Sequence, residues 1–111
     1  MNFSPGDIYW VPLEESSGIV HPHVVIQEDA LNSDRVVIVT LTTNIKWISL
    51  PGNVLLEIGE ANLPKQSIVS VSQISIVPKT QLGEYIGSLS KARVDQILAG
   101  MRFVQRMTAH H

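Results

Sequence analysis

The sequence lacks cysteine, which excludes a disulfide-stapled fold, thiolate catalysis and any zinc site with cysteine ligands. Long hydrophobic runs are also missing, since none approaches the roughly 18–20 apolar residues that a transmembrane helix needs. No positive charge precedes an apolar block near the start, so we expect no signal peptide. With 44% hydrophobic residues, the 111-residue chain can still bury a core. We therefore expect a single cytoplasmic domain that does not associate with a membrane.

Positive charge is absent from the first 34 residues, which hold six acidic residues and neither lysine nor arginine. The rest of the chain carries a small excess of basic residues, and the formal net charge is −2. This balance argues against tight binding of nucleic acid through bulk electrostatics. It still permits a local basic surface in the middle of the chain.

Turn-forming residues divide the first three-quarters of the chain into short segments rich in β-branched residues. Each segment is bounded by proline, glycine or a polar cluster, which is typical of β-strands. We expect five strands, at residues 8–11, 24–26, 36–41, 54–58 and 68–77. Their number and spacing indicate a small, strongly bent sheet or barrel.

The hydrophobic period changes near the end of the chain. Five apolar residues recur there at the spacing of an amphipathic helix: Val94, Ile97, Leu98, Met101 and Val104. Ser90 is the expected N-cap of this helix. Gly100 costs about 1 kcal/mol of helix propensity, so packing against the sheet must hold the helix. Residues 81–86 are expected to form a short helical turn before it.

Two histidines flank a proline directly before the second expected strand. His21 and His23 point to the same face if this segment is extended. They can be ordinary surface residues, or groups that move protons or contact phosphate, because imidazole titrates near neutral pH. A metal site would need a third ligand, and the sequence has no HxxxH pattern. We expect neither a metal nor another cofactor.

A polar cluster ends the most hydrophobic expected strand. Thr40, Thr42 and Thr43 are followed by Asn44, and then by Lys46 and Trp47. The threonines fit β-propensity followed by a turn, or a group of hydroxyls and amides that binds an anion such as phosphate. A cation beside an aromatic ring can hold phosphate and stack a base, although a lone tryptophan is also common in cores and interfaces.

Ser70, Ser72 and Gln73 place polar groups inside an otherwise apolar strand, facing either a groove or solvent. Beyond these candidates, the sequence contains no GxSxG, Walker or dinucleotide-binding motif. Composition and spacing alone therefore indicate a small barrel-like domain without naming its function.

Six short segments do occur in a recognisable order. They are residues 6–11 (GDIYWV), 21–26 (HPHVVI), 37–44 (VIVTLTTN), 62–67 (NLPKQS), 71–74 (VSQI) and 86–90 (IGSLS). In this order and spacing they resemble motifs of the PemK/MazF (Kid) family, the toxins of type II toxin–antitoxin systems. The resemblance runs from about Pro5 to Gln105.

The resemblance implies a mainly β (α+β) fold, an SH3-like β-barrel with a C-terminal α-helix, in one domain over residues 1–111. It also implies a homodimer, a cognate antitoxin, and metal-independent endoribonuclease activity on single-stranded RNA. In that chemistry the 2′-OH attacks the adjacent phosphate, so the site needs a base, an acid and donors for the phosphorane charge. Loops 14–18 and 49–53 are expected to set the cleavage sequence.

Carried over residue by residue, the family's catalytic arginine falls on His21, and its threonine falls on Thr43, with Thr42 one register away. The family's acidic residue falls on Ser72, and an arginine of some PemK-type members falls on Ser70. We therefore expect His21, as acid and base, and Thr43 to be catalytic. Seven further residues are expected to bind RNA: His23, Thr42, Asn44, Lys46, Trp47, Ser72 and Gln73. The alternative is a catalytically degenerate barrel that only binds an antitoxin, RNA or another protein.

Overall fold

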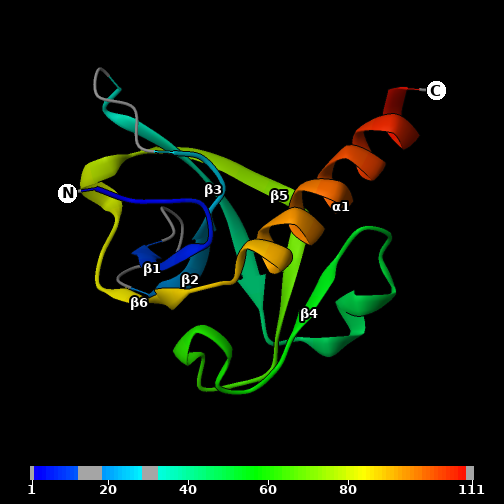
Figure 1. Cartoon of the computed structure of the whole chain (residues 1–111), viewed down its shortest axis with the longest axis horizontal. Helices are drawn as coiled ribbons and strands as arrows, with labels where there is room; N and C mark the ends of the chain where they lie inside the picture. Colours follow the sequence, from blue (N-terminus) through cyan, green and yellow to red (C-terminus); the bar gives the residue numbers. More distant parts are fainter. Residues whose placement is uncertain (1, 13–18, 29–32, 110–111) are drawn as a thin grey trace.

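The computed structural model describes residues 2–12, 19–28 and 33–109 (Figure 1). Within these residues, six strands form one antiparallel sheet with the order β4-β5-β3-β2-β1-β6, and one long helix follows the last strand. The strands are β1 (Asp7–Pro12), β2 (Val20–Val25), β3 (Arg35–Thr42), β4 (Val54–Leu56), β5 (Ser67–Pro78) and β6 (Tyr85–Ser88). The helix α1 spans Lys91–Ala109, and the short 3₁₀ helices are η1 (Ile45–Ser49), η2 (Glu60–Asn62) and η3 (Lys79–Gln81).

The two edges of the sheet approach each other through η2. This turn follows the edge strand β4 and packs against β6, the strand at the opposite edge. The Asn62 side chain donates a hydrogen bond from Nδ2 to the carbonyl oxygen of Ile86 at 3.0 Å. Gly87 must be a glycine, because the Ala61 carbonyl oxygen occupies the space that a Cβ would take. The sheet therefore curls into a half-barrel, which confirms the predicted mainly β fold with a C-terminal helix.

β3 contributes to hydrophobic clusters on both of its faces, because its alternate residues point in opposite directions. The first cluster contains Ile8, Val24, Val39, Leu41, Leu56, Leu63, Val69, Val71, Leu89 and Ile97. The second contains Phe3, Tyr9, Val11, Val25, Val36, Ile38 and Leu82. A strand that is buried on both faces reads as a nearly continuous apolar run, which explains the run of β-branched residues seen in the sequence.

The helix α1 begins where the sequence predicts. The Ser90 hydroxyl accepts a hydrogen bond from the backbone N–H of Arg93 at 3.2 Å, which confirms Ser90 as the N-cap. Val94 and Ile97 are buried. Further along, Gly100 packs directly against the backbone of Gly52, in the turn that precedes β4. Packing therefore explains why a glycine stands inside the helix.

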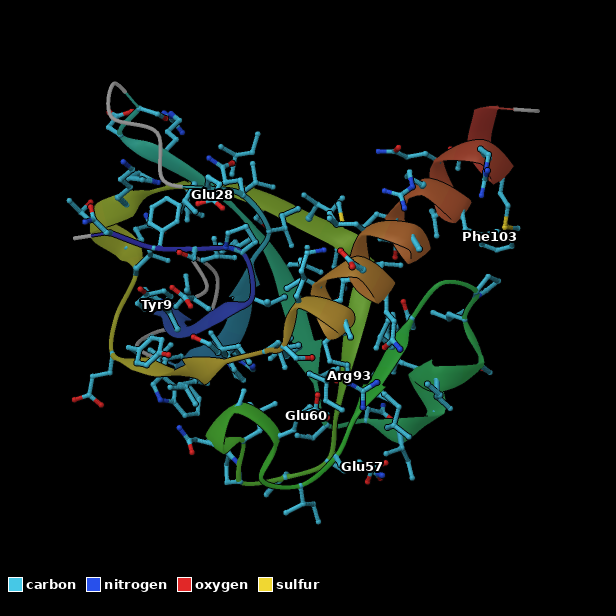
Figure 2. All side chains as sticks on the ribbon, in the orientation of Figure 1. Tyr9, Glu28, Glu57, Glu60, Arg93 and Phe103 are labelled. Atoms are coloured by element: carbon cyan, nitrogen blue, oxygen red, sulfur yellow. The ribbon has the colours of Figure 1, made fainter. Side chains whose placement is uncertain are left out.

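An ion pair joins the first turn of α1 to η2 (Figure 2). The guanidinium of Arg93 contacts both carboxylate oxygens of Glu60, with Nε–Oε2 at 2.7 Å and Nη2–Oε1 at 3.0 Å. These hydrogen bonds from Arg93 lower the pKa of Glu60 below its usual value. The bidentate geometry fixes the helix against the turn that closes the half-barrel.

The predicted helical turn at residues 81–86 is wrong. Residues 79–81 form η3, and the chain then extends into β6. β6 is a strand because it pairs with β1, with Asp7 opposite Ser88 and Ile8 opposite Gly87. Such a pairing joins distant parts of the chain, so local propensity does not report it.

β2 begins at Val20, four residues before the predicted start, and the histidine pair therefore lies inside the strand. Pro22 is tolerated there because pairing between β2 and β3 begins only at His23, so the missing N–H costs no hydrogen bond on that side. On its other side, Pro22 lies opposite Trp10 of β1.

β4 is shorter than predicted and ends at Leu56.

Candidate functional site

A cleft of about 340 Å³ opens where β2, the end of β3, η1 and β5 meet. Six of the nine predicted site residues line it: His21, Thr42, Thr43, Asn44, Trp47 and Gln73. Pro22, Thr40, Leu41 and Ser67 complete the lining. Among the described residues, these lining side chains include no carboxylate, so the cleft presents an imidazole, hydroxyls, amides and an indole.

His21 and His23 occupy different environments although they share a face of β2. His21 is half-buried and lines the cleft. His23 is only 2% exposed and lies between Tyr9 of β1 and Thr40 of β3. Its Nδ1 lies 3.0 Å from the carbonyl oxygen of His21, and because that oxygen can only accept, Nδ1 carries the proton. Burial lowers the pKa of His23, because the charged imidazolium would lose its solvation.

The polar cluster after β3 is organised by its own hydrogen bonds. The Thr42 hydroxyl accepts from the backbone N–H of Asn44 at 3.2 Å. The Asn44 side chain then caps η1 by accepting from the backbone N–H of Lys46 at 3.3 Å. The Thr43 side chain is exposed, and its hydroxyl has no hydrogen-bond partner among the residues that the structure describes. Thr43 is therefore free to donate to a ligand, while its two neighbours shape the turn.

Trp47 separates the cleft from a second hollow of about 300 Å³, which is lined by Lys46, Trp47, Ser49 and Leu50. Lys46 therefore lies beside the cleft and not in it. Ser72 lines a third hollow of about 230 Å³, next to Val104 and Met107 of α1. Gln73 lines the cleft, whereas Ser72 lies on the side of the helix. Of the predicted site residues, His23, Lys46 and Ser72 are not gathered in the cleft.

Thr40 and Ser67 also line the cleft. The sequence placed Thr40 in the polar cluster at the end of the strand but not among the nine site residues, and it gave no role to Ser67. For Thr40 a signal was available, because it lies two residues before Thr42 and so shares its face of the strand. Ser67 begins β5 and reaches the cleft only through the curl of the sheet.

No group of three potential metal ligands comes together within the described residues. None of the helices formed by these residues is long and apolar enough to cross a membrane.

Comparison with known proteins identifies the family. Residues 4–104 match the family described as "PemK-like, MazF-like toxin of type II toxin-antitoxin system". The chain belongs to the PemK/MazF toxin family. Among PemK/MazF relatives, endoribonuclease MazF6 of Mycobacterium tuberculosis is 32% identical over 111 residues, covering 94% of this chain and 97% of the relative. Endoribonuclease MazF2 of Mycobacterium bovis matches with the same identity and coverage.

Two solved structures share the fold of this chain. A mycobacterial endoribonuclease in complex with its cognate antitoxin superposes with a TM-score of 0.74 at 23% identity, covering 89% of this chain and 90% of that one. The Mycobacterium tuberculosis toxin MazF-mt6 gives a TM-score of 0.72 at 18% identity, covering 86% and 91% of the two chains. The curled sheet with its C-terminal helix is thus a fold that this chain shares with the solved toxin MazF-mt6.

Proposed function

We propose that this chain is the toxin of a type II toxin–antitoxin system and a metal-independent endoribonuclease that cleaves single-stranded RNA in the cleft. The relatives that match nearly the whole chain at 32% identity are named endoribonucleases. The observation that carries the proposal is the lining of the cleft, which brings His21, Thr43 and Trp47 together from three separate segments. An imidazole, a free hydroxyl and an aromatic ring are suited to proton transfer, phosphate binding and base stacking.

In this reaction the RNA 2′-oxygen attacks the adjacent phosphorus, and the bond from phosphorus to the 5′-oxygen breaks. His21 accepts the 2′ proton, and the resulting imidazolium delivers it to the departing 5′-oxygen. Thr43 donates a hydrogen bond to a non-bridging phosphate oxygen, where negative charge grows. The products are a 2′,3′-cyclic phosphate and a 5′-hydroxyl.

The partners follow from the same proposal. Large apolar side chains remain exposed on β5 and α1, among them Ile74, Ile76, Phe103 and Met107, and a homodimer would cover such a surface. One similar structure is a complex with a cognate antitoxin, which supports an antitoxin as the second partner. We propose that the antitoxin blocks the cleft with an acidic segment, because the described residues that line the cleft include no carboxylate that would repel it. The site of action is the cytoplasm, where the RNA is.

The test is incubation of the purified protein with a mixed RNA in EDTA. We expect fragments with 2′,3′-cyclic phosphate ends, because no metal takes part. His21→Ala should lower the cleavage rate by about 10²–10⁴, the usual contribution of one acid–base group. Thr43→Ala should also slow cleavage, whereas the control Thr80→Ala, at an exposed position in η3, should not.

RNA that stays intact at micromolar protein would contradict the proposed activity. If such intact RNA is nevertheless bound, the chain is a binding module. Wild-type cleavage that persists in His21→Ala would remove His21 from the mechanism.

A further inference from the structure

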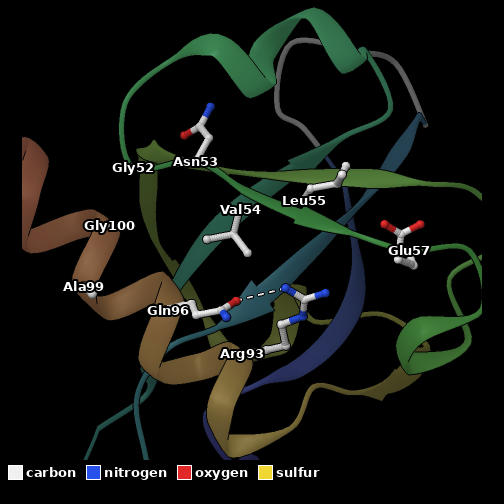
Figure 3. Close-up of a pocket in the computed structure, with 9 residues that line it drawn as sticks. All are labelled: Gly52, Asn53, Val54, Leu55, Glu57, Arg93, Gln96, Ala99 and Gly100. Carbon is white, nitrogen blue, oxygen red and sulfur yellow. Dashed lines mark hydrogen bonds between the residues drawn. The ribbon is translucent and has the colours of Figure 1, made fainter.

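The side chain of Asn53 links two segments that form walls of the cleft, η1 and β5. Its Nδ2 donates a hydrogen bond to the carbonyl oxygen of Trp47 at 2.9 Å. Its Oδ1 accepts one from the backbone N–H of Val71 at 3.0 Å. Asn53 lies next to Gly52, directly before β4, and both residues line the hollow between β4 and α1 that Figure 3 shows. Asn53 is not among the residues that line the cleft. One amide group therefore ties η1, which carries Trp47, to β5, which carries Gln73.

The bond to β5 lies at an irregular part of the strand. Val39 of β3 pairs with Ile74, but Leu41 pairs with Val69, so residues 70–73 bulge opposite Thr40 alone. The N–H of Val71 lies within this bulge and donates to Asn53. Gln73 follows two residues later and lines the cleft. The amide oxygen of Asn53 thus holds the bulge of β5 from which Gln73 reaches the cleft.

The bond to Trp47 fixes the opposite wall. The Trp47 carbonyl oxygen also accepts a hydrogen bond at 3.2 Å from the backbone N–H of Leu50, the residue that caps the end of η1. The Trp47 side chain separates the cleft from the neighbouring hollow, so a shift of η1 would change the width of both. The turn that carries Asn53 is itself held, because Gly52 packs against Gly100 of α1.

We infer that Asn53 is a positioning residue that sets the separation of Trp47 and Gln73, and through it the fit of RNA bases in the cleft. The inference rests on the proposed endoribonuclease function. A fixed spacing between a stacking ring and an amide selects the nucleotide that fits between them, and a loosened spacing accepts more of them. Asn53 touches neither substrate nor reacting atoms, so it acts on substrate binding more than on the chemical step.

The sharpest variant is Asn53→Asp, which keeps the size of the side chain and the acceptor for Val71. It replaces the donor to Trp47 with a second carboxylate oxygen, which repels the Trp47 carbonyl. We expect KM for RNA to rise about tenfold while kcat changes less than about threefold, together with cleavage at additional sequences. The matched control is Asn62→Asp, because Asn62 also donates from Nδ2 to a carbonyl oxygen, that of Ile86, on the far side of the half-barrel.

An NMR measurement separates this inference from the proposed activity. The chain has two tryptophans, so an ¹⁵N-labelled sample gives two indole N–H signals. In Asn53→Asp the Trp47 signal should shift or broaden while the Trp10 signal stays in place, and Asn62→Asp should leave Trp47 unchanged. Asn53→Ser, which removes both bonds without adding a charge, is the second variant if the aspartate does not fold.

An unmoved Trp47 signal with an unchanged KM would overturn the inference, even if the wild type cleaves RNA. A wild type that cleaves no RNA would refute the proposed function, and the Trp47 signal would still decide whether Asn53 positions that wall. A fall in kcat alone would also overturn the inference, because it would assign Asn53 to the chemical step.

Discussion

Replacing Gly100 by alanine sets helix propensity against packing, and the two predict opposite results. Alanine in the middle of a helix is favoured over glycine by about 1 kcal/mol, so propensity alone predicts a more stable protein. In the structure, however, a Cβ at Gly100 would overlap the carbonyl oxygen of Gly52 (Figure 3). We expect packing to prevail and Gly100→Ala to be destabilising.

The magnitude follows from what must move. The overlapping atom belongs to the backbone, so no change of side-chain rotamer relieves the contact, and either α1 or the turn at Gly52 must shift. Overpacking of this kind costs roughly 2–3 kcal/mol, from which the propensity gain of about 1 kcal/mol is subtracted. The net loss is about 1–2 kcal/mol, and for a chain of this size it lowers Tm by about 4–8 °C.

Thermal unfolding and urea titration of Gly100→Ala would measure this loss. Ala99→Gly is the control, because Ala99 is exposed on the adjacent helix position and should lose only the propensity of about 1 kcal/mol. Since the turn at Gly52 leads into Asn53, Gly100→Ala should also raise KM for RNA. A Tm equal to or above that of the wild type would refute the packing argument.

Three further predictions concern titratable groups. Burial lowers the pKa of His23, so below about pH 6.5 the unfolded chain binds a proton at this residue that the folded chain does not bind. The free energy of unfolding should therefore decrease by up to about 1.4 kcal/mol for each unit by which pH falls, and urea titrations should show that it depends less on pH in His23→Asn. Arg93 lowers the pKa of Glu60, so the ion pair stabilises the fold at neutral pH, and this stabilisation is lost as pH falls through the lowered pKa. Glu60→Gln should lower the free energy of unfolding by about 1–2 kcal/mol at pH 7, and thermal melts from pH 3 to 7 should show that the part of the acid destabilisation due to Glu60 is gone. His21→Arg should be as slow as His21→Ala in initial-rate assays from pH 5 to 9, because a guanidinium does not release its proton, and full activity would mean that His21 supplies only charge.

The parts of the fold that the sequence predicts depend on local signals. The β-branched run of β3 and the helical period of α1 are visible within their own segments of the sequence, and the Ser90 cap acts within one turn. β6 escaped prediction because it is a strand only by pairing with β1, whose residues lie far away in the chain. The approach of η2 to β6 is tertiary in the same way.

The candidate site shows the same division. His21 and Thr43 fall in segments that the family motifs mark, and the curl of the sheet brings both to the cleft. Ser72 and Gln73 are adjacent in the sequence, and the alternation of a regular strand would already have predicted that they face different sides. Asn53 lies in loop 49–53, which the sequence links to the cleavage sequence, but no motif singles it out, because its two hydrogen bonds go to distant backbone groups.

The contact between Gly52 and Gly100 also has a consequence during synthesis of the chain. Every wall of the cleft lies between β2 and β5, so the ribosome makes all of them before it makes α1. At elongation rates of about 5–20 residues per second, a few seconds pass before the helix is complete. Until then nothing supports the turn at Gly52 from the helix side, and the walls of the cleft are not yet held at their final spacing. The walls of the cleft therefore reach their final spacing only after α1 has packed against the turn at Gly52.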